Sequence, residues 1–115
     1  MNKLTLAAVA FVGTSFAASA QEMLTDANGM TLYSFDKDSG GVSACYGDCA
    51  VNWPPYMGVE GAVMGDSWTL VDRTDGTKQW AYDGMPMYFF KTDVKVGDKT
   101  GDGVGDVWHV VMEED

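Results

Sequence analysis

The strongest constraint on this chain is that part of it is repeated. When the sequence is shifted by 55 residues, six residues of an ungapped 25-residue window coincide. The coinciding pairs are Gly29/Gly84, Met30/Met85, Tyr33/Tyr88, Phe35/Phe90, Asp38/Asp93 and Trp53/Trp108. A unit this small cannot bury its apolar face alone. We therefore expect a single domain in which two repeats, about residues 23–55 and 77–112, pack together with pseudo-two-fold symmetry around one core.

Turn signals between short apolar runs predict a mainly β fold. Asn28-Gly29 joins residues 23–25 to 30–35, residues 73–76 join 68–71 to 77–82, and Asp83-Gly84 joins 77–82 to 87–90. Two-residue sequences of the Asn-Gly and Asp-Gly type are strong hairpin signals. Residues 107–112 are predicted to form a final strand.

Little of the chain favours a helix, because no stretch keeps a helical period over ten residues. Residues 45–52 can hold one short helical turn, which Pro54-Pro55 would end. Residues 57–66 contain three glycines and are predicted to form a mobile loop.

The first twenty residues have the composition of a signal peptide. Lys3 supplies a positive charge, residues 4–12 form an apolar run, and Ala18-Ser19-Ala20 fits a cleavage site before Gln21. The apolar run is shorter than the roughly 20 residues that span a bilayer. No Cys follows the cleavage site to accept a lipid. We expect a periplasmic or secreted protein with no transmembrane segment.

The charge balance excludes several classes of partner. The chain has 7 basic and 17 acidic residues, a net charge of −10. Loss of Lys3 with the signal peptide leaves 6 basic and 17 acidic residues, or −11. Nucleic acid and anionic membrane surfaces are not expected to bind such a chain, because it cannot neutralise their phosphates. A cationic, metallic or neutral ligand, or an envelope protein, is the expected partner. The 12 % aromatic content predicts a folded aromatic core.

The repeats resemble a known family, the small secreted bacterial proteins with a Tyr-x4-Asp motif that are often labelled predicted lipoproteins. The matching segments are residues 33–38 and 88–93, residues 45–50 with Trp53-Pro54-Pro55, residues 76–80, and residues 103–111. The resemblance implies an exported protein of unknown biochemical function. Because the chain lacks a lipid-acceptor Cys, a soluble form is expected.

The Tyr-x4-Asp motif has two interpretations. In a strand, Tyr33 and Phe35 point to the same face, and Asp38 follows where a carboxylate can accept loop N–H groups. The structural interpretation is therefore two core aromatics with a loop-fixing Asp. In the functional interpretation Tyr33/Asp38 and Tyr88/Asp93 line a shared site across the pseudo-axis. The repeat equivalent of Phe35 is Phe90.

The two cysteines are spaced Cys-x3-Cys, at Cys45 and Cys49. In an exported chain such a pair is normally a disulfide, which would fix the loop before Trp53. A redox-active or metal-holding pair is the alternative.

Two metal sites are conceivable. Asp98, Asp102 and Asp106 lie in a glycine-rich run that resembles a calcium loop, although position twelve is His109 instead of Glu. Copper could use the thioethers of Met85 and Met87 with His109, although Met is more often core filler.

Enzyme signatures are absent from the sequence pattern, so no catalytic residues are assigned. The chain has one His, no recognisable Ser elbow, and no glycine-rich loop that opens a helix. We expect a non-catalytic exported protein that binds a ligand or supports an envelope assembly. A periplasmic calcium- or copper-binding protein is the alternative, and an uncharacterised enzyme is the third choice.

Overall fold

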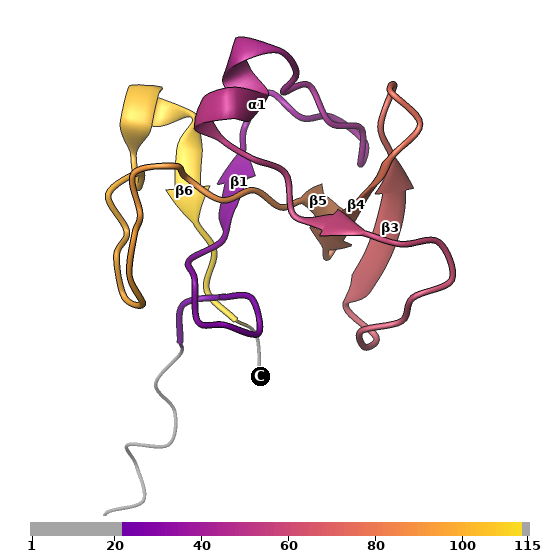
Figure 1. The fold of residues 1–115 in the computed structure, drawn as a ribbon, viewed down its shortest axis with the longest axis horizontal. Helices are drawn as coiled ribbons and strands as arrows, with labels where there is room; N and C mark the ends of the chain where they lie inside the picture. Colours follow the sequence, from indigo (N-terminus) through magenta and orange to yellow (C-terminus); the bar gives the residue numbers. More distant parts are fainter. Residues whose placement is uncertain (1–21, 114–115) are drawn as a thin grey trace, which may run out of the picture.

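The computed structural model describes residues 22–113, and Figure 1 shows their arrangement. The predicted signal peptide, residues 1–20, lies outside the described residues. The fold is mainly β, as the sequence predicts, with strands in two small sheets and two short helical turns.

The first sheet joins the two repeats. Strand β1 (Tyr33–Phe35) pairs antiparallel with β6 (Trp108–Val110), so the Tyr strand of one repeat meets the Trp segment of the other. On its other side β1 forms backbone hydrogen bonds with Tyr88, which also belongs to the second repeat. The N–H of Tyr33 donates to the carbonyl of Tyr88 at 2.8 Å, and the N–H of Tyr88 donates to the carbonyl of Tyr33 at 3.0 Å. This reciprocal pair lies at the centre of the expected pseudo-two-fold symmetry.

The converse pairing, between the Tyr strand of the second repeat and the Trp segment of the first, is irregular. Pro55 bridges to Tyr88, and the N–H of Phe89 donates to the carbonyl of Pro54 at 2.7 Å. Proline has no N–H to donate, so these two residues cannot complete a ladder. The symmetry is therefore present in the contacts but broken in the secondary structure.

The second sheet is built around β4 (Lys78–Tyr82). Strand β3 (Trp68–Asp72) pairs along one side, and β2 (Met57–Gly58) and β5 (Met85–Pro86) pair with β4 as well. The hairpin between β3 and β4 is as predicted. The Asp83-Gly84 turn also forms, but it leads into the two-residue strand β5 and not into the predicted strand 87–90. Within 87–90 only Tyr88 makes β-bridges, because it pairs with Tyr33 and Pro55 of the first repeat. Asp83 and Gly84 both have positive φ, 50° and 83°, which Gly adopts readily.

Several details differ from the prediction. Residues 57–66 are not entirely loop, because β2 adds to the edge of β4. The predicted strand 30–35 is regular only over β1, and its hairpin partner contributes an isolated bridge between Thr25 and Thr31. The helical turn α1 (Asp48–Asn52) is as expected, whereas the second turn, η2 (Val104–Asp106), was not predicted. Each helical turn precedes a Trp, so η2 is the repeat equivalent of α1.

The structure has two clusters of buried residues, where one core was expected. One contains Tyr33, Cys45, Trp53, Tyr88 and Trp108, and the other contains Leu24, Leu32, Tyr82 and Met87. Successive side chains of an extended segment point to opposite faces. Leu32 and Met87 therefore face one cluster while their neighbours Tyr33 and Tyr88 face the other. The seam between the repeats is buried on both sides.

Four stacked rings fill the first cluster. Trp53 and Trp108 stack with ring centroids 3.8 Å apart and planes 1° apart. Phe35 stacks on Trp108, and Phe90 stacks on Trp53, both with centroids 4.0 Å apart. All four belong to coinciding pairs of the repeat, so the repeated aromatic residues make one continuous stack across the seam.

Candidate functional site

The tyrosines and aspartates of the repeated motif pair across the repeats. The Tyr33 hydroxyl donates to Asp93 Oδ2 at 2.7 Å, and the Tyr88 hydroxyl donates to Asp38 Oδ2 at 2.9 Å. Both tyrosines are completely buried. Burial, followed by the hydrogen bond to Asp93, raises the pKa of Tyr33. The motif thus joins the repeats, and neither Tyr bonds the Asp of its own copy.

The second oxygen of each Asp holds the loop that follows it. Asp38 Oδ1 accepts the N–H of Ala44 at 2.8 Å, and Asp93 Oδ1 accepts the N–H of Thr100 at 2.9 Å. The Thr100 hydroxyl also donates to Asp93 Oδ1, at 2.6 Å. These are the loop contacts that the structural interpretation of the motif requires.

The two Tyr–Asp pairs differ in their surroundings. The Tyr33 hydroxyl accepts the backbone N–H of Gly101 at 3.1 Å, whereas the Tyr88 hydroxyl lies against the Ser43 hydroxyl. Asp93 is only 8 % exposed, and Asp38 is more accessible. Burial raises the pKa of Asp38, with the hydrogen bonds from Ala44 and Tyr88 acting in the opposite direction.

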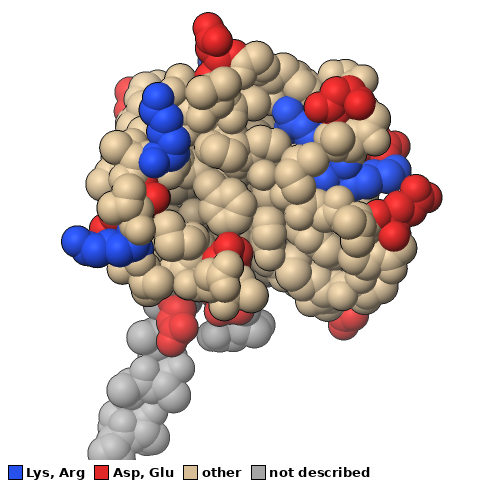
Figure 2. Space-filling model, viewed as in Figure 1, with Lys and Arg blue, Asp and Glu red and all other residues tan. Residues whose placement is uncertain are grey.

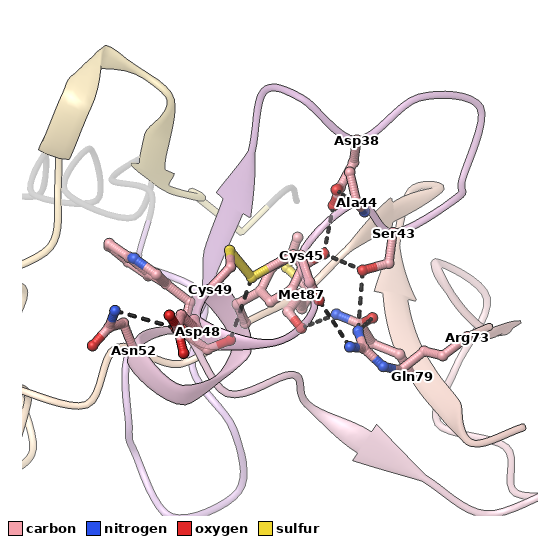
Figure 3. Close-up of a disulfide and its surroundings, with 12 residues drawn as sticks. Asp38, Ser43, Ala44, Cys45, Asp48, Cys49, Asn52, Arg73, Gln79 and Met87 are labelled. Atoms are coloured by element: carbon pink, nitrogen blue, oxygen red, sulfur yellow. Dashed lines mark hydrogen bonds between the residues drawn. A yellow bond between two sulfur atoms is a disulfide. The ribbon is translucent and has the colours of Figure 1, made fainter. Parts of the chain in front are cut away.

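A buried arginine supports the more open pair (Figure 3). Arg73 is 5 % exposed, and its Nη1 donates to Ser43 Oγ at 3.0 Å and to Gln79 Oε1 at 2.8 Å. Its Nη2 donates to the carbonyl of Cys45 at 2.8 Å. A chain of contacts therefore runs from Arg73 through Ser43 and Tyr88 to Asp38. The sequence predicts Arg73 only as a turn residue, and the one signal that distinguishes it is that the chain has no other Arg.

The expected disulfide is present between Cys45 and Cys49. Cys45 is buried in the first cluster, and the bridge joins it to the first turn of α1. The bridge therefore fixes the loop that carries Ser43, which contacts the Tyr88 hydroxyl, and Ala44, which donates to Asp38.

A cavity of about 260 Å³ lies beside this pair. Its wall includes residues of β1 and the following turn, and residues of the β4–β5 hairpin. Among them are Ser34, Asp36, Asp38, Gly41, Gly84 and Met85. Two carboxylates contribute to this wall, and no Lys or Arg does. Of the four motif residues in the Tyr–Asp pairs, only Asp38 lines the cavity.

The predicted calcium ligands do not come together. Asp98 Oδ2 accepts the N–H groups of Val94 and Lys95, at 2.9 and 3.1 Å. Asp102 Oδ1 accepts the N–H of Val110 at 3.1 Å, and Asp106 lies in η2. Within residues 22–113, no group of three or more His, Cys, Asp or Glu side chains could hold a metal ion. The carboxylate of Asp98 thus caps N–H groups of its own loop, and that of Asp102 caps an N–H group of β6.

The predicted copper ligands are also separated. Met87 is fully buried in the second cluster, whereas Met85 is 37 % exposed and lines the cavity. His109 lies on the exposed side of the first sheet, where its Nε2 is 2.8 Å from Asp36 Oδ2. Met85 lines the same cavity as Asp36, whereas Met87 does not.

A comparison with protein families gives one match. A family described as a secreted repeat of unknown function matches residues 16–57 and 69–112. The matched segments contain both repeat units. Neither a curated protein nor a solved structure matches the chain. In the part of the chain that the structure describes, no helix has the length and apolar character needed to cross a membrane.

Proposed function

Because the chain belongs to this family of secreted repeats of unknown function, we propose that it is an exported binding module, acting in the periplasm or outside the cell, whose cavity holds a cationic group. The observation that carries the proposal is the cavity wall, to which Asp36 and Asp38 contribute carboxylates and no Lys or Arg contributes. Asp36 contacts the His109 ring at 2.8 Å through one of its two carboxylate oxygens. We assign it no chemical step.

Charge and shape favour an amine or guanidinium group as the ligand. The chain carries a net charge of −10, so a cation is attracted to the molecule before it reaches the cavity. Gly41 and Gly84 contribute backbone without side chains to the wall, and Met85 contributes an apolar surface. A ligand with a positive head and a short apolar stem fits this combination. It could be a small molecule or a Lys or Arg side chain of an envelope protein.

The Tyr88–Asp38 pair would orient the cavity carboxylate. Asp38 accepts one hydrogen bond from Ala44 and one from Tyr88, so its carboxylate cannot rotate freely. An ionised carboxylate has about four acceptor positions, which leaves room for a ligand donor. The Asp93 side has no equivalent, because Thr100 adds a second donor there. We therefore propose one ligand site per chain, despite the repeat.

The experiment is an NMR titration of the processed protein with agmatine, which carries both an amine and a guanidinium group. We expect saturable shifts of the backbone amides of Ser34, Asp36, Gly41 and Gly84. D36N should weaken binding about fivefold, as expected for a partly exposed charge contact of ~1 kcal/mol.

D66N is the matched control, because it removes the same charge from an exposed carboxylate outside the cavity wall. Its affinity for agmatine should stay within error of the parent protein. Shifts spread over the whole acidic surface, or equal weakening in D36N and D66N, would show that agmatine is held only by general charge attraction and would refute the site.

A further inference from the structure

Most strand edges of the described chain are closed by identifiable contacts. On the side of β6 away from β1, the carbonyl of Trp108 accepts the N–H of Gly103 at 2.7 Å. On the same side the N–H of Val110 donates to Asp102 Oδ1. Strand β1 has partners on both sides, and residues 54–56 beside β2 bond to the segment 87–89. Such closure prevents another chain from adding to a sheet.

Strand β3 is the exception. It lies at one end of the order β2-β4-β3, and among residues 22–113 it pairs with no strand except β4. In Figure 1 it lies at the right margin of the molecule.

The flanking hydrogen bonds show which residues of β3 face outward. The N–H of Asp83 donates to the carbonyl of Ser67, and the N–H of Arg73 donates to the carbonyl of Thr77. Because the direction of the backbone groups alternates along a strand, Thr69 and Val71 also bond to β4. Trp68, Leu70 and Asp72 then point their N–H and C=O groups away from it.

The outward groups of Leu70 and Asp72 find no partner in the described part of the chain. The N–H of Trp68 turns back to the carbonyl of Gly65 at 3.2 Å, but no hydrogen bond outside the β4 ladder reaches Leu70 or the backbone of Asp72. Buried backbone groups are nearly always paired, so unpaired groups on a strand edge indicate a place for water or for another strand.

The loop that leads into β3 carries exposed apolar side chains. Val59 and Val63, between β2 and β3, are 71 % and 89 % exposed. Exposed apolar side chains in this loop offer contact area to a bound segment in addition to backbone hydrogen bonds.

The charges around the edge select the kind of partner. Residues 59–83 contain five acidic residues, Glu60, Asp66, Asp72, Asp75 and Asp83, and two basic ones, Arg73 and Lys78. Arg73 is buried, and Lys78 pairs with Asp72. Figure 2 shows that, on the face drawn, charged side chains lie mainly at the periphery, including this margin. A second copy of the chain would bring a second net charge of −10 and be repelled.

We propose that the free edge of β3 binds an extended segment of a partner protein that carries Lys or Arg side chains, by adding it as a strand. Backbone bonds to Leu70 and Asp72 supply the affinity, and the acidic surroundings supply the selectivity. This inference does not depend on the cavity, which is lined by other residues.

The first test needs no partner. Amide hydrogen exchange of the free protein should be fast at Leu70 and Asp72 and slow at Thr69 and Val71, whose N–H groups bond to β4. Slow exchange at all four positions at low protein concentration would mean that the edge is already covered. Protection that grows with protein concentration would identify a second copy as the occupant. Either result overturns the proposal.

The second test uses a synthetic peptide, acetyl-Lys-Thr-Val-Arg-Val-Lys-amide, with two matched controls. It should slow exchange at Leu70 and Asp72. The same peptide N-methylated at alternate residues keeps its charges but cannot form the ladder, and it should bind roughly tenfold more weakly. A version with Glu in place of Lys and Arg should not bind detectably. Equal binding of the N-methylated peptide would overturn the proposal.

Variants of β3 separate backbone pairing from charge. D72N keeps the outward N–H and loses the charge, whereas D72P loses both without removing a backbone hydrogen bond to β4. Both variants lose the side-chain pair with Lys78, so that loss cancels in the comparison. D72P should therefore bind the peptide several-fold more weakly than D72N. Equal affinities would exclude the Asp72 N–H as a contact, and D36N should leave the peptide affinity unchanged.

Discussion

At the scale of single residues, the repeated Tyr-x4-Asp motif joins the two halves of the chain by hydrogen bonds. Each Tyr hydroxyl donates to the Asp of the other repeat, and that Asp holds its own loop with its second oxygen. A buried hydroxyl or carboxylate without a partner costs about 1–3 kcal/mol. Each of the four side chains therefore depends on a residue about 50 to 60 positions away.

Double-mutant cycles should show that the pairing is crossed. We expect Y33F and D93N to be coupled by about 1 kcal/mol in the free energy of unfolding, because they remove the two ends of one hydrogen bond. Y33F and D38N belong to the same copy of the motif but share no bond, so their effects should add. Chemical denaturation of the three single and two double variants gives both values, and coupling only within each copy would contradict the structure.

Asp38 and Asp98 should respond to pH in opposite directions. Burial raises the pKa of Asp38, whereas the hydrogen bonds from the N–H groups of Val94 and Lys95 lower the pKa of Asp98. The contribution of Asp38 to stability is therefore present at low pH and lost as the pH rises through its folded-state pKa. The contribution of Asp98 is present above its unfolded pKa and is lost as the pH falls.

Carbon NMR of the carboxyl groups should give a midpoint above 3.8 for Asp38 and below 3.8 for Asp98. With rising pH, D38N should gain stability relative to the parent protein, and D98N should lose it. Parallel slopes for the two variants would show that the environments of these carboxylates are not as described.

The sequence indicated which residues matter here but not how they pair. The offset of 55 residues identified both tyrosines and both aspartates, because a repeated residue can be found by comparing the chain with itself. It could not show that Tyr33 bonds Asp93, since crossing and non-crossing arrangements have the same sequence pattern. Ser43 and Arg73 have no identical residue at this offset, so the repeat gave no reason to choose them.

At the scale of elements, the two loops between strand and Trp are built differently. In the first repeat a disulfide joins Cys45 to α1, and Cys45 is buried in the aromatic cluster. In the second repeat the residues at the places of Cys45 and Cys49 are Thr100 and Val104. Beside them, a Cβ added at Gly101 would be 2.6 Å from Trp53. The disulfide loop is the one that reaches Arg73 and the cavity-lining Asp38.

Removing the disulfide should loosen one loop and leave the other unchanged. For a ring this short, the C45A/C49A variant should lose about 2 kcal/mol of stability. Amide exchange of Ala44, which donates to Asp38, should accelerate. Amide exchange of Thr100, which donates to Asp93, is the internal control. It should accelerate only by the amount that the loss of global stability explains. Equal local acceleration at both amides would show that the disulfide acts only on the whole fold.

Local signals predicted the elements well where a turn determines them. The turns at residues 73–76 and at Asp83-Gly84 form as expected, because their turn residues favour one backbone geometry. Strand β2 was not predicted, since two residues of a glycine-rich segment pair only because β4 offers an edge. The calcium site predicted from residues 98–106 is not formed by the described residues, for a related reason. The carboxylates of Asp98 and Asp102 accept backbone N–H groups, a role that spacing alone does not distinguish from metal ligation.

At the scale of the whole molecule, the repeats are intertwined and not merely adjacent. Strand β1 pairs with β6 from the other repeat and with Tyr88, and the ring stack alternates between the repeats from Phe35 through Trp108 and Trp53 to Phe90. Each ring of the stack therefore packs against a ring of the other repeat. This arrangement gives a short chain two buried clusters. Because the contacts cross between the repeats, we expect neither repeat to be stable alone.

Separate halves should consequently fail to fold. Residues 22–62 and 63–113, made as two chains, should each show random-coil circular dichroism and no near-ultraviolet Trp signal. The reason is that Trp53 and Trp108 stack on each other, and each also stacks on the Phe of the other repeat. When the two chains are mixed, they should regain that signal. The midpoint of thermal unfolding of the mixture should depend on protein concentration, as it does for a two-chain complex. The W108A version of the second half removes the centre of the stack and should not restore the signal. If either half folds alone, its strands must find partners within the repeat, and the crossed pairing would not be what holds the fold together.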